Sequence, residues 1–285
     1  MDIKESVKNT FEVKDKTKLN YRIWKTSVHP GSSTQDKKVI ILSHGLGEYS
    51  GRYNHVAEFF NQKGISVYAL DHRGHGESPG PRGYVNSFSQ YVEDLGQFVT
   101  HIWHQEKDKE FYLLGHSMGG LIAIGHLIEG APYIHAAVLS SPLLGIKITG
   151  AVLKRAMAQV LSKIIPSLGL YNEIDLGAAC RDQEIVRRTL KDPLVHQKIT
   201  PRLYTEMLRM IRYAWSNVTL IHHPLLLVQA GEDKIVDRDK AIAFVKSTSS
   251  RSHTIHVYDG FYHEVLNDIE RIKVLNDIHH WMIGV

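Results

Sequence analysis

The sequence predicts a mostly parallel α/β sheet with helices on both faces, interrupted by a helical insertion. Two observations carry this prediction: short apolar runs alternate with longer amphipathic stretches, and the alternation stops between about residues 142 and 223. Short, branched or leucine-rich runs that end at Gly, Ser, Asp or Pro are typical of strands buried on both faces, which is the pattern of a parallel sheet. Strands that alternate with helices imply βαβ crossovers.

Eight strands are expected along the chain. An antiparallel hairpin opens it and six further strands follow, at Phe11–Lys14, Asn20–Trp24, Val39–Leu42, Ile65–Leu70, Phe111–Leu114, Ala136–Leu139, Leu225–Val228 and Thr254–Tyr258. Amphipathic spacing predicts helices between them. These are Tyr53–Gln62, Phe88–His104 and Met118–Ile128, with a closing helix at Glu264–Ile283.

The interruption reads as a helical cap. Apolar residues from 151 to 165 form one helical stripe that ends before Pro166, and further helical patterns follow at Gln183–Leu190 and Pro201–Trp215. The stripe consists of Val152, Leu153, Met157, Val160, Leu161, Ile164 and Ile165. We therefore predict a main α/β domain from residues 1–141 and 224–285, and a cap from residues 142–223.

Composition narrows the class of protein. The chain has 285 residues, 43% of them hydrophobic and 22% charged, with a net charge of +4, as in ordinary soluble globular proteins. Basic residues are scattered among acids, so nucleic acid is not the expected partner. Cys180 is the single cysteine and forms no intrachain disulfide. Met1–Ser6 lacks the apolar segment of a signal peptide, and no apolar run is long enough for a membrane span. We expect a cytoplasmic protein, and the sequence assigns no oligomeric state.

A nucleophile motif stands between a predicted strand and a predicted helix. Gly115-His-Ser-Met-Gly119 matches G-x-S-x-G, in which a serine on a sharp strained turn needs neighbours without side chains. Ser117 would then lie at a helix N-terminus, where free N–H groups favour developing negative charge. The bare pattern is short enough to arise by chance, and the strand before it and helix after it favour the functional interpretation.

An oxyanion hole needs two backbone donors. One is expected at Met118, directly after the nucleophile. The other is expected from the loop Ser43-His-Gly-Leu-Gly-Glu48, which follows an earlier strand, with the Leu46 N–H as the candidate. A plain glycine turn between strand and helix is the alternative for this loop.

An acid and a base are expected after the serine, in that order. Asp233 comes first after the strand that begins at Leu225, at the edge where α/β sites form, and Asp237 and Glu232 are the alternatives. His263 follows the last strand, where it could reach both the serine and the acid. Other histidines have weaker cases: His253 and His256 belong to a strand pattern, and His222, His223, His279 and His280 look like junction or surface residues.

Neither a metal nor an organic cofactor is expected. His101 and His104 share a helix face, but no carboxylate or cysteine set accompanies them. Attack by a serine activated by histidine needs no further group.

These motifs together resemble the monoacylglycerol lipase and lysophospholipase branch of the serine α/β-hydrolases. The matching segments span the chain from about Val39 to the C-terminus. They are His44-Gly-Leu-Gly-Glu-Tyr-Ser-Gly-Arg-Tyr53, Asp71-His-Arg-Gly-His-Gly-Glu-Ser78, Gly115-His-Ser-Met-Gly-Gly120, Asp192-Pro-Leu-Val195, Gly231-Glu-Asp233 and Tyr262-His-Glu264. Many relatives have Ala where this chain has Leu46, which leaves the backbone donor in place and alters the pocket entrance.

The resemblance implies an α/β-hydrolase fold and a set of roles. Ser117, Asp233 and His263 would be the catalytic triad, with oxyanion donors at Leu46 and Met118. Glu48 and Arg52 match positions near the polar end of the pocket, where a glycerol-like head group would lie; a helix-start ion pair is the alternative. Leu143 and Leu144, with Ile146, could line an acyl-chain tunnel, or could pack the cap onto the sheet.

The implied reaction is hydrolysis of a lipid ester, with monoacylglycerol as the first candidate substrate. Lysophospholipase, short-chain carboxylesterase and aminopeptidase activities are alternatives within enzymes, and a non-catalytic ligand-binding protein is the alternative outside them. A further hypothesis is peripheral membrane contact through the cap helix at 151–165, which carries Lys154, Arg155 and Lys163 beside its apolar stripe.

Overall fold

The computed structural model describes residues 6–26, 37–147, 151–172 and 174–285. Side chains of residues 151–155, which include the predicted stripe residues Val152 and Leu153 and the basic Lys154 and Arg155, lie outside that description.

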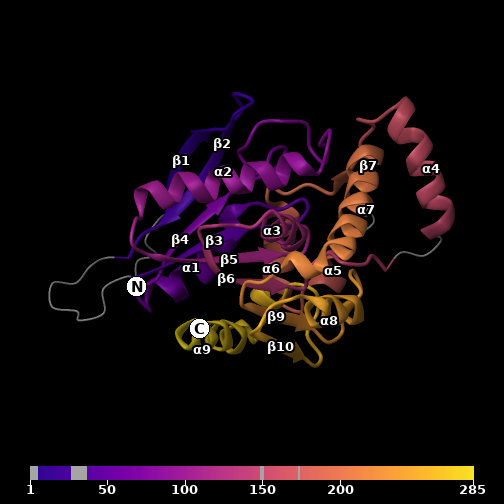
Figure 1. The fold of residues 1–285 in the computed structure, drawn as a ribbon. Coiled ribbons are helices and arrows are strands. Elements are labelled where there is room, and N and C mark those ends of the chain that lie inside the picture. Colours follow the sequence, from indigo (N-terminus) through magenta and orange to yellow (C-terminus); the bar gives the residue numbers. More distant parts are fainter. Residues whose placement is uncertain (1–5, 27–36, 148–150, 173) are drawn as a thin grey trace.

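An eight-stranded sheet forms the centre of the molecule, in the order β1-β2-β4-β3-β5-β6-β9-β10 (Figure 1). Its strands are β1 (Val7–Glu12), β2 (Lys18–Trp24), β3 (Lys38–Ser43), β4 (Ser66–Leu70), β5 (Glu110–His116), β6 (Ile134–Ser140), β9 (Leu225–Ala230) and β10 (His253–Tyr258). β2 pairs antiparallel with β1 and β4, and all other neighbours are parallel. The predicted mostly parallel α/β sheet is confirmed.

Helices cover both faces of this sheet, because its central strands are apolar on both sides. On one face, α1 (Asn54–Asn61) and α9 (Arg271–Gly284) bury Phe60 and Ile278 against the sheet. On the other, α2 (Ser89–Gln105), α3 (Met118–Ile128) and α8 (Arg238–Ser247) share a second core. Every residue of α3 is buried, which agrees with a sequence that is apolar except for His126.

In the described residues between β6 and β9 lie four α-helices, a 3₁₀ helix (Val218–Leu220) and a small ribbon. The α-helices are α4 (Ala151–Ile164), α5 (Leu176–Ala179), α6 (Gln183–Lys191) and α7 (Pro201–Ser216), and the ribbon pairs β7 (Leu170–Tyr171) with β8 (Lys198–Ile199). α7 packs on α3 and joins the main core, whereas α4 packs on α7 and lies at the outer end of the molecule (Figure 1). We keep the name cap for residues 142–223, the range that the sequence analysis predicts as an insertion.

Two predicted elements differ from the structure. The first strand is β1 at Val7–Glu12 rather than Phe11–Lys14, because Val13 and Thr17 already form the hairpin turn. The closing helix begins at Arg271 rather than Glu264. Asp268 is extended there, accepts the Glu270 N–H and pairs with Arg181 of the cap, so the chain cannot continue helically. The sequence analysis also missed α5, α8, β7 and β8.

No helix among the described ranges is long and apolar enough to cross a membrane.

Candidate active site

Ser117 occupies a strained turn between β5 and α3. Its φ of 51° and ψ of −117° place a non-glycine residue in the left-handed half of the map, which is uncommon and needs support from its surroundings. Gly119 provides some of that support, because a β-carbon there would lie 2.1 Å from the Ser43 carbonyl oxygen. The glycine therefore lets α3 approach the end of β3, as the motif predicts.

His263 bridges Ser117 and Asp233. Its Nε2 lies 2.9 Å from Ser117 Oγ, and its Nδ1 lies 2.8 Å from Asp233 Oδ2. Asp233 is further held by the N–H groups of Ile235 and Val236, each 2.9 Å from Oδ1. The three residues predicted from chain order thus meet at the carboxyl ends of β5, β9 and β10, as expected for a parallel sheet.

The alternative acids lie elsewhere. Asp237 caps α8, since its carboxylate accepts the N–H groups of Asp239 and Lys240. Glu232 is exposed. This difference favours Asp233 as the partner of His263.

Burial and charge act in opposite directions on this pair. Burial by itself would lower the pKa of His263, but the Asp233 carboxylate and its hydrogen bond reverse the effect and raise that pKa above 6.5. Burial would likewise raise the pKa of Asp233, yet the charge and hydrogen bond of His263 lower it. His116 lies beside His263, with tilted rings whose centroids are 5.0 Å apart, and burial lowers the pKa of His116 to about 4, so it stays neutral.

The loop from His44 to Glu48 lies directly against the nucleophile. A β-carbon on Gly45 would lie 3.3 Å from Ser117 Cβ. The Gly45 N–H donates to Glu48 Oε1 over 2.6 Å, and His44 Nδ1 donates to the Gly45 carbonyl over 2.8 Å. Leu46 and Met118, the candidate oxyanion donors, both line the cavity that contains Ser117. We call residues 44–47 the oxyanion loop.

A buried ion cluster lies beside this loop. The Arg52 guanidinium contacts Glu48 Oε2 at 2.6 Å and Glu264 Oε2 at 2.8 Å, and it donates to Thr189 Oγ1 of the cap over 3.1 Å. Glu48 also accepts a hydrogen bond from the Tyr53 hydroxyl. Although burial would raise the pKa of Glu264, Arg52 holds it down at about 2. Glu48 and Arg52 therefore form the ion pair of one interpretation and also line the cavity beside Ser117, as the other interpretation requires.

The sequence analysis gave no role to Glu264. The residue directly follows His263 in the motif Tyr262-His-Glu264, which was the available signal. Its partner Arg52 lies 212 positions away in sequence, so the pairing itself follows only from the fold.

Two cavities meet at Ser117. The larger, about 310 Å³, is mostly apolar and is lined by Leu46, Met118, Leu143, Ile146, Met207 and Tyr204 among others. We call it the chamber. The smaller, about 60 Å³, is lined by Glu48, Arg52, His116, His263, Glu264 and Gln197 among others. We call it the polar recess. Leu144 is buried in the core beside the chamber, with its carbonyl accepting from Trp215 Nε1.

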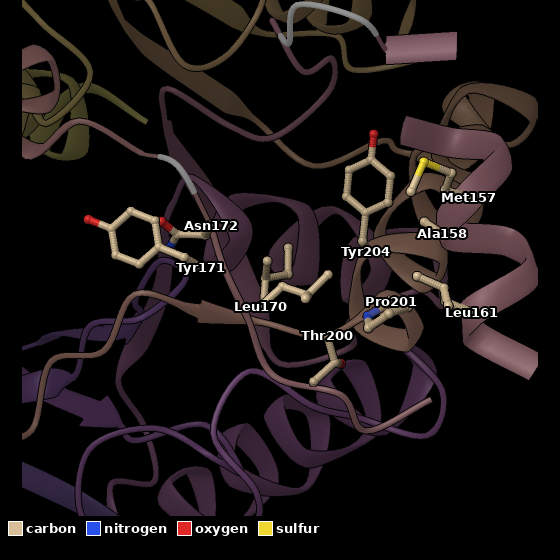
Figure 2. A pocket seen from close by; sticks show the side chains of 10 residues that line it. Met157, Ala158, Leu161, Leu170, Tyr171, Asn172, Thr200, Pro201 and Tyr204 are labelled. Carbon is tan, nitrogen blue, oxygen red and sulfur yellow. The ribbon is translucent and has the colours of Figure 1, made fainter. Parts of the chain in front are cut away.

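A third cavity, about 230 Å³, lies within the cap (Figure 2). Met157, Ala158 and Leu161 approach it from α4, while Leu170, Tyr171 and Asn172 approach from the other side. Asn172, Ile199 and Tyr204 line both this cap cavity and the chamber, so the two adjoin.

The competing histidines have other surroundings. His256 is half-exposed beside Asp277 on the edge strand β10, and His101 stacks on Phe11. Among the residues that the structure describes, no group of three or more His, Cys, Asp or Glu side chains is arranged to hold a metal.

Comparison with known proteins agrees with this arrangement. Residues 34–270 match the family described as serine aminopeptidase, S33 (Hydrolase_4). A monoacylglycerol lipase of Mycolicibacterium smegmatis is 33% identical over 94% of this chain and 93% of its own length. The phospholipase YtpA of Bacillus subtilis is 32% identical over 83% of this chain and 91% of its own length.

A solved structure adds to the sequence relatives. The crystal structure of the Paleococcus ferrophilus monoacylglycerol lipase superposes with a TM-score of 0.82 at 30% identity, over 93% of this chain and 98% of that one. The predicted α/β-hydrolase fold and the predicted serine ester hydrolase class are thereby confirmed. The chain belongs to the serine aminopeptidase, S33 family of α/β-hydrolases, in its monoacylglycerol lipase and lysophospholipase branch.

Proposed function

We propose that this protein hydrolyses lipid monoesters, with monoacylglycerol as its preferred substrate, through an acyl-enzyme on Ser117. The observation that carries the proposal is a pair of hydrogen bonds: His263 Nδ1 donates to the Asp233 carboxylate over 2.8 Å, and His263 Nε2 accepts from the Ser117 hydroxyl over 2.9 Å. A serine, a histidine base and an orienting carboxylate in this geometry are the components of nucleophilic acyl transfer.

The reaction proceeds in two steps. Ser117 Oγ attacks the ester carbonyl while His263 Nε2 takes its proton, and the carbonyl oxygen becomes an oxyanion held by the N–H groups of Leu46 and Met118. The protonated His263 then donates to the leaving alcohol, which departs as glycerol. Water attacks the acyl-enzyme by the same route and releases the fatty acid. Removal of one oxyanion donor typically lowers the rate by roughly 10²–10³-fold.

The two cavities support a single orientation of the substrate. The apolar chamber suits an acyl chain, and Leu143 and Ile146 contribute to its wall. The polar recess, with Glu48, Arg52 and Gln197, suits the hydroxyl groups of glycerol. A chain longer than the chamber would continue between Ile199 and Tyr204 into the cap cavity.

Hydrolysis of lysophospholipids is the second candidate. One relative is a phospholipase, and Lys147 and Lys234 line the chamber, where they could pair with a phosphate. Monoacylglycerol stays the first choice because the relatives from Mycolicibacterium smegmatis, rat and mouse are monoacylglycerol or monoglyceride lipases.

Two measurements test the proposal. A fluorophosphonate probe should label the unmodified protein and leave Ser117→Ala unlabelled. A panel of monoacylglycerol, lysophosphatidylcholine, p-nitrophenyl esters and amino-acid amides should then give the highest kcat/KM with monoacylglycerol. Folded protein that stays unlabelled would instead be a ligand-binding member of the fold, and a preference for amides would make it an aminopeptidase.

We also propose that α4 contacts the membrane surface from which the lipid is taken. Met157, Val160 and Ile164 are exposed to 54%, 56% and 70%. A groove beside them is lined by four basic residues, Lys163, Arg202, Arg209 and Arg212. Exposed apolar side chains flanked by basic ones are typical of helices that lie in a lipid interface.

Co-sedimentation with liposomes tests this contact. Val160→Asp and Ile164→Asp should reduce binding, whereas Ile283→Asp, an equally exposed position on α9, should not. If the unmodified protein does not sediment with liposomes, the proposal is wrong.

A further inference from the structure

Residues 196–200 of the cap, which include β8 and which we call the cap strand, lie directly on two glycine turns of the main domain. The His196 N–H donates to the Gly47 carbonyl over 2.9 Å, and the Thr200 N–H donates to the Gly83 carbonyl over 3.0 Å. Gly47 and Gly83 have φ of 77° and 69°. A β-carbon on Gly47 would lie 2.2 Å from the His196 carbonyl oxygen, and one on Gly83 would lie 2.3 Å from that of Lys198. The cap strand therefore occupies the space that a side chain would need.

One of these two turns is the oxyanion loop. Gly47 follows Leu46, whose N–H is the proposed oxyanion donor. The main domain holds the start of this loop: the Gly45 N–H donates to Glu48, and the Gly45 carbonyl accepts from the His44 ring. The cap holds the end of the loop, because the His196 N–H donates to the Gly47 carbonyl. The direction of the Leu46 N–H is thus fixed from both sides.

The His196 side chain lies beside other buried histidine rings. Its ring lies 5.0 Å from that of His75, which lies 5.3 Å from that of His44. His44 Nε2 in turn accepts the His72 N–H over 3.1 Å. Burial lowers the pKa of His196 to about 4, so its ring stays uncharged near neutral pH.

The same cap strand reaches the substrate cavities. Gln197, next to His196, lines the polar recess and accepts the Asn172 N–H over 2.9 Å through its carbonyl. Asn172 lines the chamber, the polar recess and the cap cavity. Two backbone hydrogen bonds therefore connect the substrate cavities to the oxyanion loop: that of Asn172 with Gln197, and that of His196 with Gly47.

We propose that His196 is a positioning residue for catalysis: its backbone N–H, given by the cap to Gly47, holds the Leu46 N–H in line with the oxyanion. The inference rests on the proposed function, because it takes Leu46 as a donor. Its consequence is that the cap contributes to the chemical step as well as to substrate binding. A displacement on the order of 1 Å at such a donor can lower a rate about 100-fold.

The test compares His196→Pro, which removes the N–H, with His196→Ala, which keeps it. His196→Pro should lower kcat by about 30-fold or more, within the range for a misplaced oxyanion donor, while KM changes less than about 3-fold. His196→Ala should recover most of kcat. A kcat for His196→Pro within about 3-fold of the unmodified protein overturns the inference.

Two inhibitors separate positioning from a general loss of structure. Ser117 Oγ adds to the carbonyl carbon of a long-chain trifluoromethyl ketone. The serine proton passes to His263, and the carbonyl oxygen becomes an oxyanion. The matching alkyl glycerol ether has no carbonyl and forms no oxyanion. His196→Pro should weaken the ketone by the same factor as kcat/KM and leave the ether within about 3-fold. Equal weakening of both overturns the inference.

A glycine pair keeps the test open if His196→Pro fails to fold. Gly47→Ala and Gly83→Ala carry similar backbone strain, but their added methyl groups meet different carbonyl oxygens of the cap, that of His196 and that of Lys198. Only Gly47 belongs to the oxyanion loop. Gly47→Ala should lower kcat and ketone affinity together, and Gly83→Ala should leave kcat within about 3-fold. Equal losses in both variants, or none in Gly47→Ala, overturn the inference. Unmodified protein that cleaves no ester overturns the proposed function instead.

Discussion

His263 lies between a buried carboxylate and the nucleophile, and its pKa determines the pH range in which the site can work. Because Asp233 raises that pKa above 6.5, the imidazole becomes neutral only at a correspondingly higher pH. Protonated His263 cannot accept the Ser117 proton, so kcat/KM should rise with pH through this pKa.

Asp233→Asn tests this relation. Loss of the carboxylate removes the interaction that raises the pKa of His263, so the acid limb of kcat/KM should move to lower pH, and kcat should fall by about 10⁴-fold because the amide holds the imidazole in the wrong tautomer. The measurement is a pH–rate profile on a soluble short-chain ester. An unchanged acid limb would show that Asp233 does not set the pKa of His263.

Arg52 holds two carboxylates that are buried together, Glu48 and Glu264. Its removal leaves both without their cation, and such losses typically destabilise a protein by about 3–5 kcal/mol. Arg52→Met should therefore lower the free energy of unfolding by an amount of that order in a urea titration. Arg188→Ala removes an exposed ion pair with Glu184 and serves as the control, with no measurable change expected. Equal midpoints for the two variants would contradict the buried-pair argument.

The turn between β5 and α3 depends on the close approach of α3 to β3. Gly119 lies where a β-carbon would meet the carbonyl oxygens of Ser43 and His44 at 2.1 and 2.4 Å. Gly119→Ala should displace the helix, lower stability by roughly 1–3 kcal/mol and abolish fluorophosphonate labelling. Gly284→Ala, with open space around it, should change neither unfolding nor labelling. Full labelling of Gly119→Ala would show that the turn tolerates the shift.

The cap cavity predicts an effect of acyl-chain length. Ala158 on α4 lines this cavity and is absent from the residues that line the chamber. Ala158→Trp should fill it and lower kcat/KM for esters of about 16–18 carbons, while esters of about 8 carbons, which fit in the chamber, keep their rate. The ratio of the two rates is the measurement. An unchanged ratio would mean that long chains take another path.

The elements differ in how far their sequences predict them. β3, β5 and β9 are apolar on both faces, so their runs are continuous and easily found. α8 buries Ala241, Phe244 and Val245 and exposes the rest of a polar sequence, so its periodicity is weak. β7 and β8 have two residues each and mostly exposed side chains, and their pairing depends on the fold around them.

The same limit applies to the site. The serine, acid and base follow from local motifs and from their order in the chain, because parallel strands bring their carboxyl ends together. The contacts of Arg52 with Glu264 and of His196 with Gly47 join segments separated by more than a hundred residues. No local pattern encodes such a contact, so the contacts that hold the residues around the triad in place can be identified only from the structure.

At the scale of the whole molecule, the cap is attached to the main domain from several directions. Arg181 pairs with Asp268, the Ala179 carbonyl accepts the Glu264 N–H, and Thr189 accepts from Arg52. Met207 and Met210 of α7 belong to the same core as α3. A cap that shares its core with the sheet has little apolar surface of its own to fold around, so it should not unfold separately.

Trp215 reports on this attachment. It lies on α7, its ring packs against Phe244 of α8 at 5.2 Å, and its Nε1 donates to the Leu144 carbonyl. In a variant with the substitutions Trp24→Phe, Trp103→Phe and Trp281→Phe, Trp215 is the one tryptophan left. Its fluorescence would follow the cap, while far-UV circular dichroism follows the whole chain. The two urea transitions should coincide in midpoint and slope, because loss of the α7 core exposes α3 and the sheet at once. A fluorescence transition at lower urea would mean that the cap unfolds first and is an independent unit. Coincident transitions would mean that the cap and the sheet form one cooperative structure. A cap that helps to position the oxyanion loop requires this cooperativity.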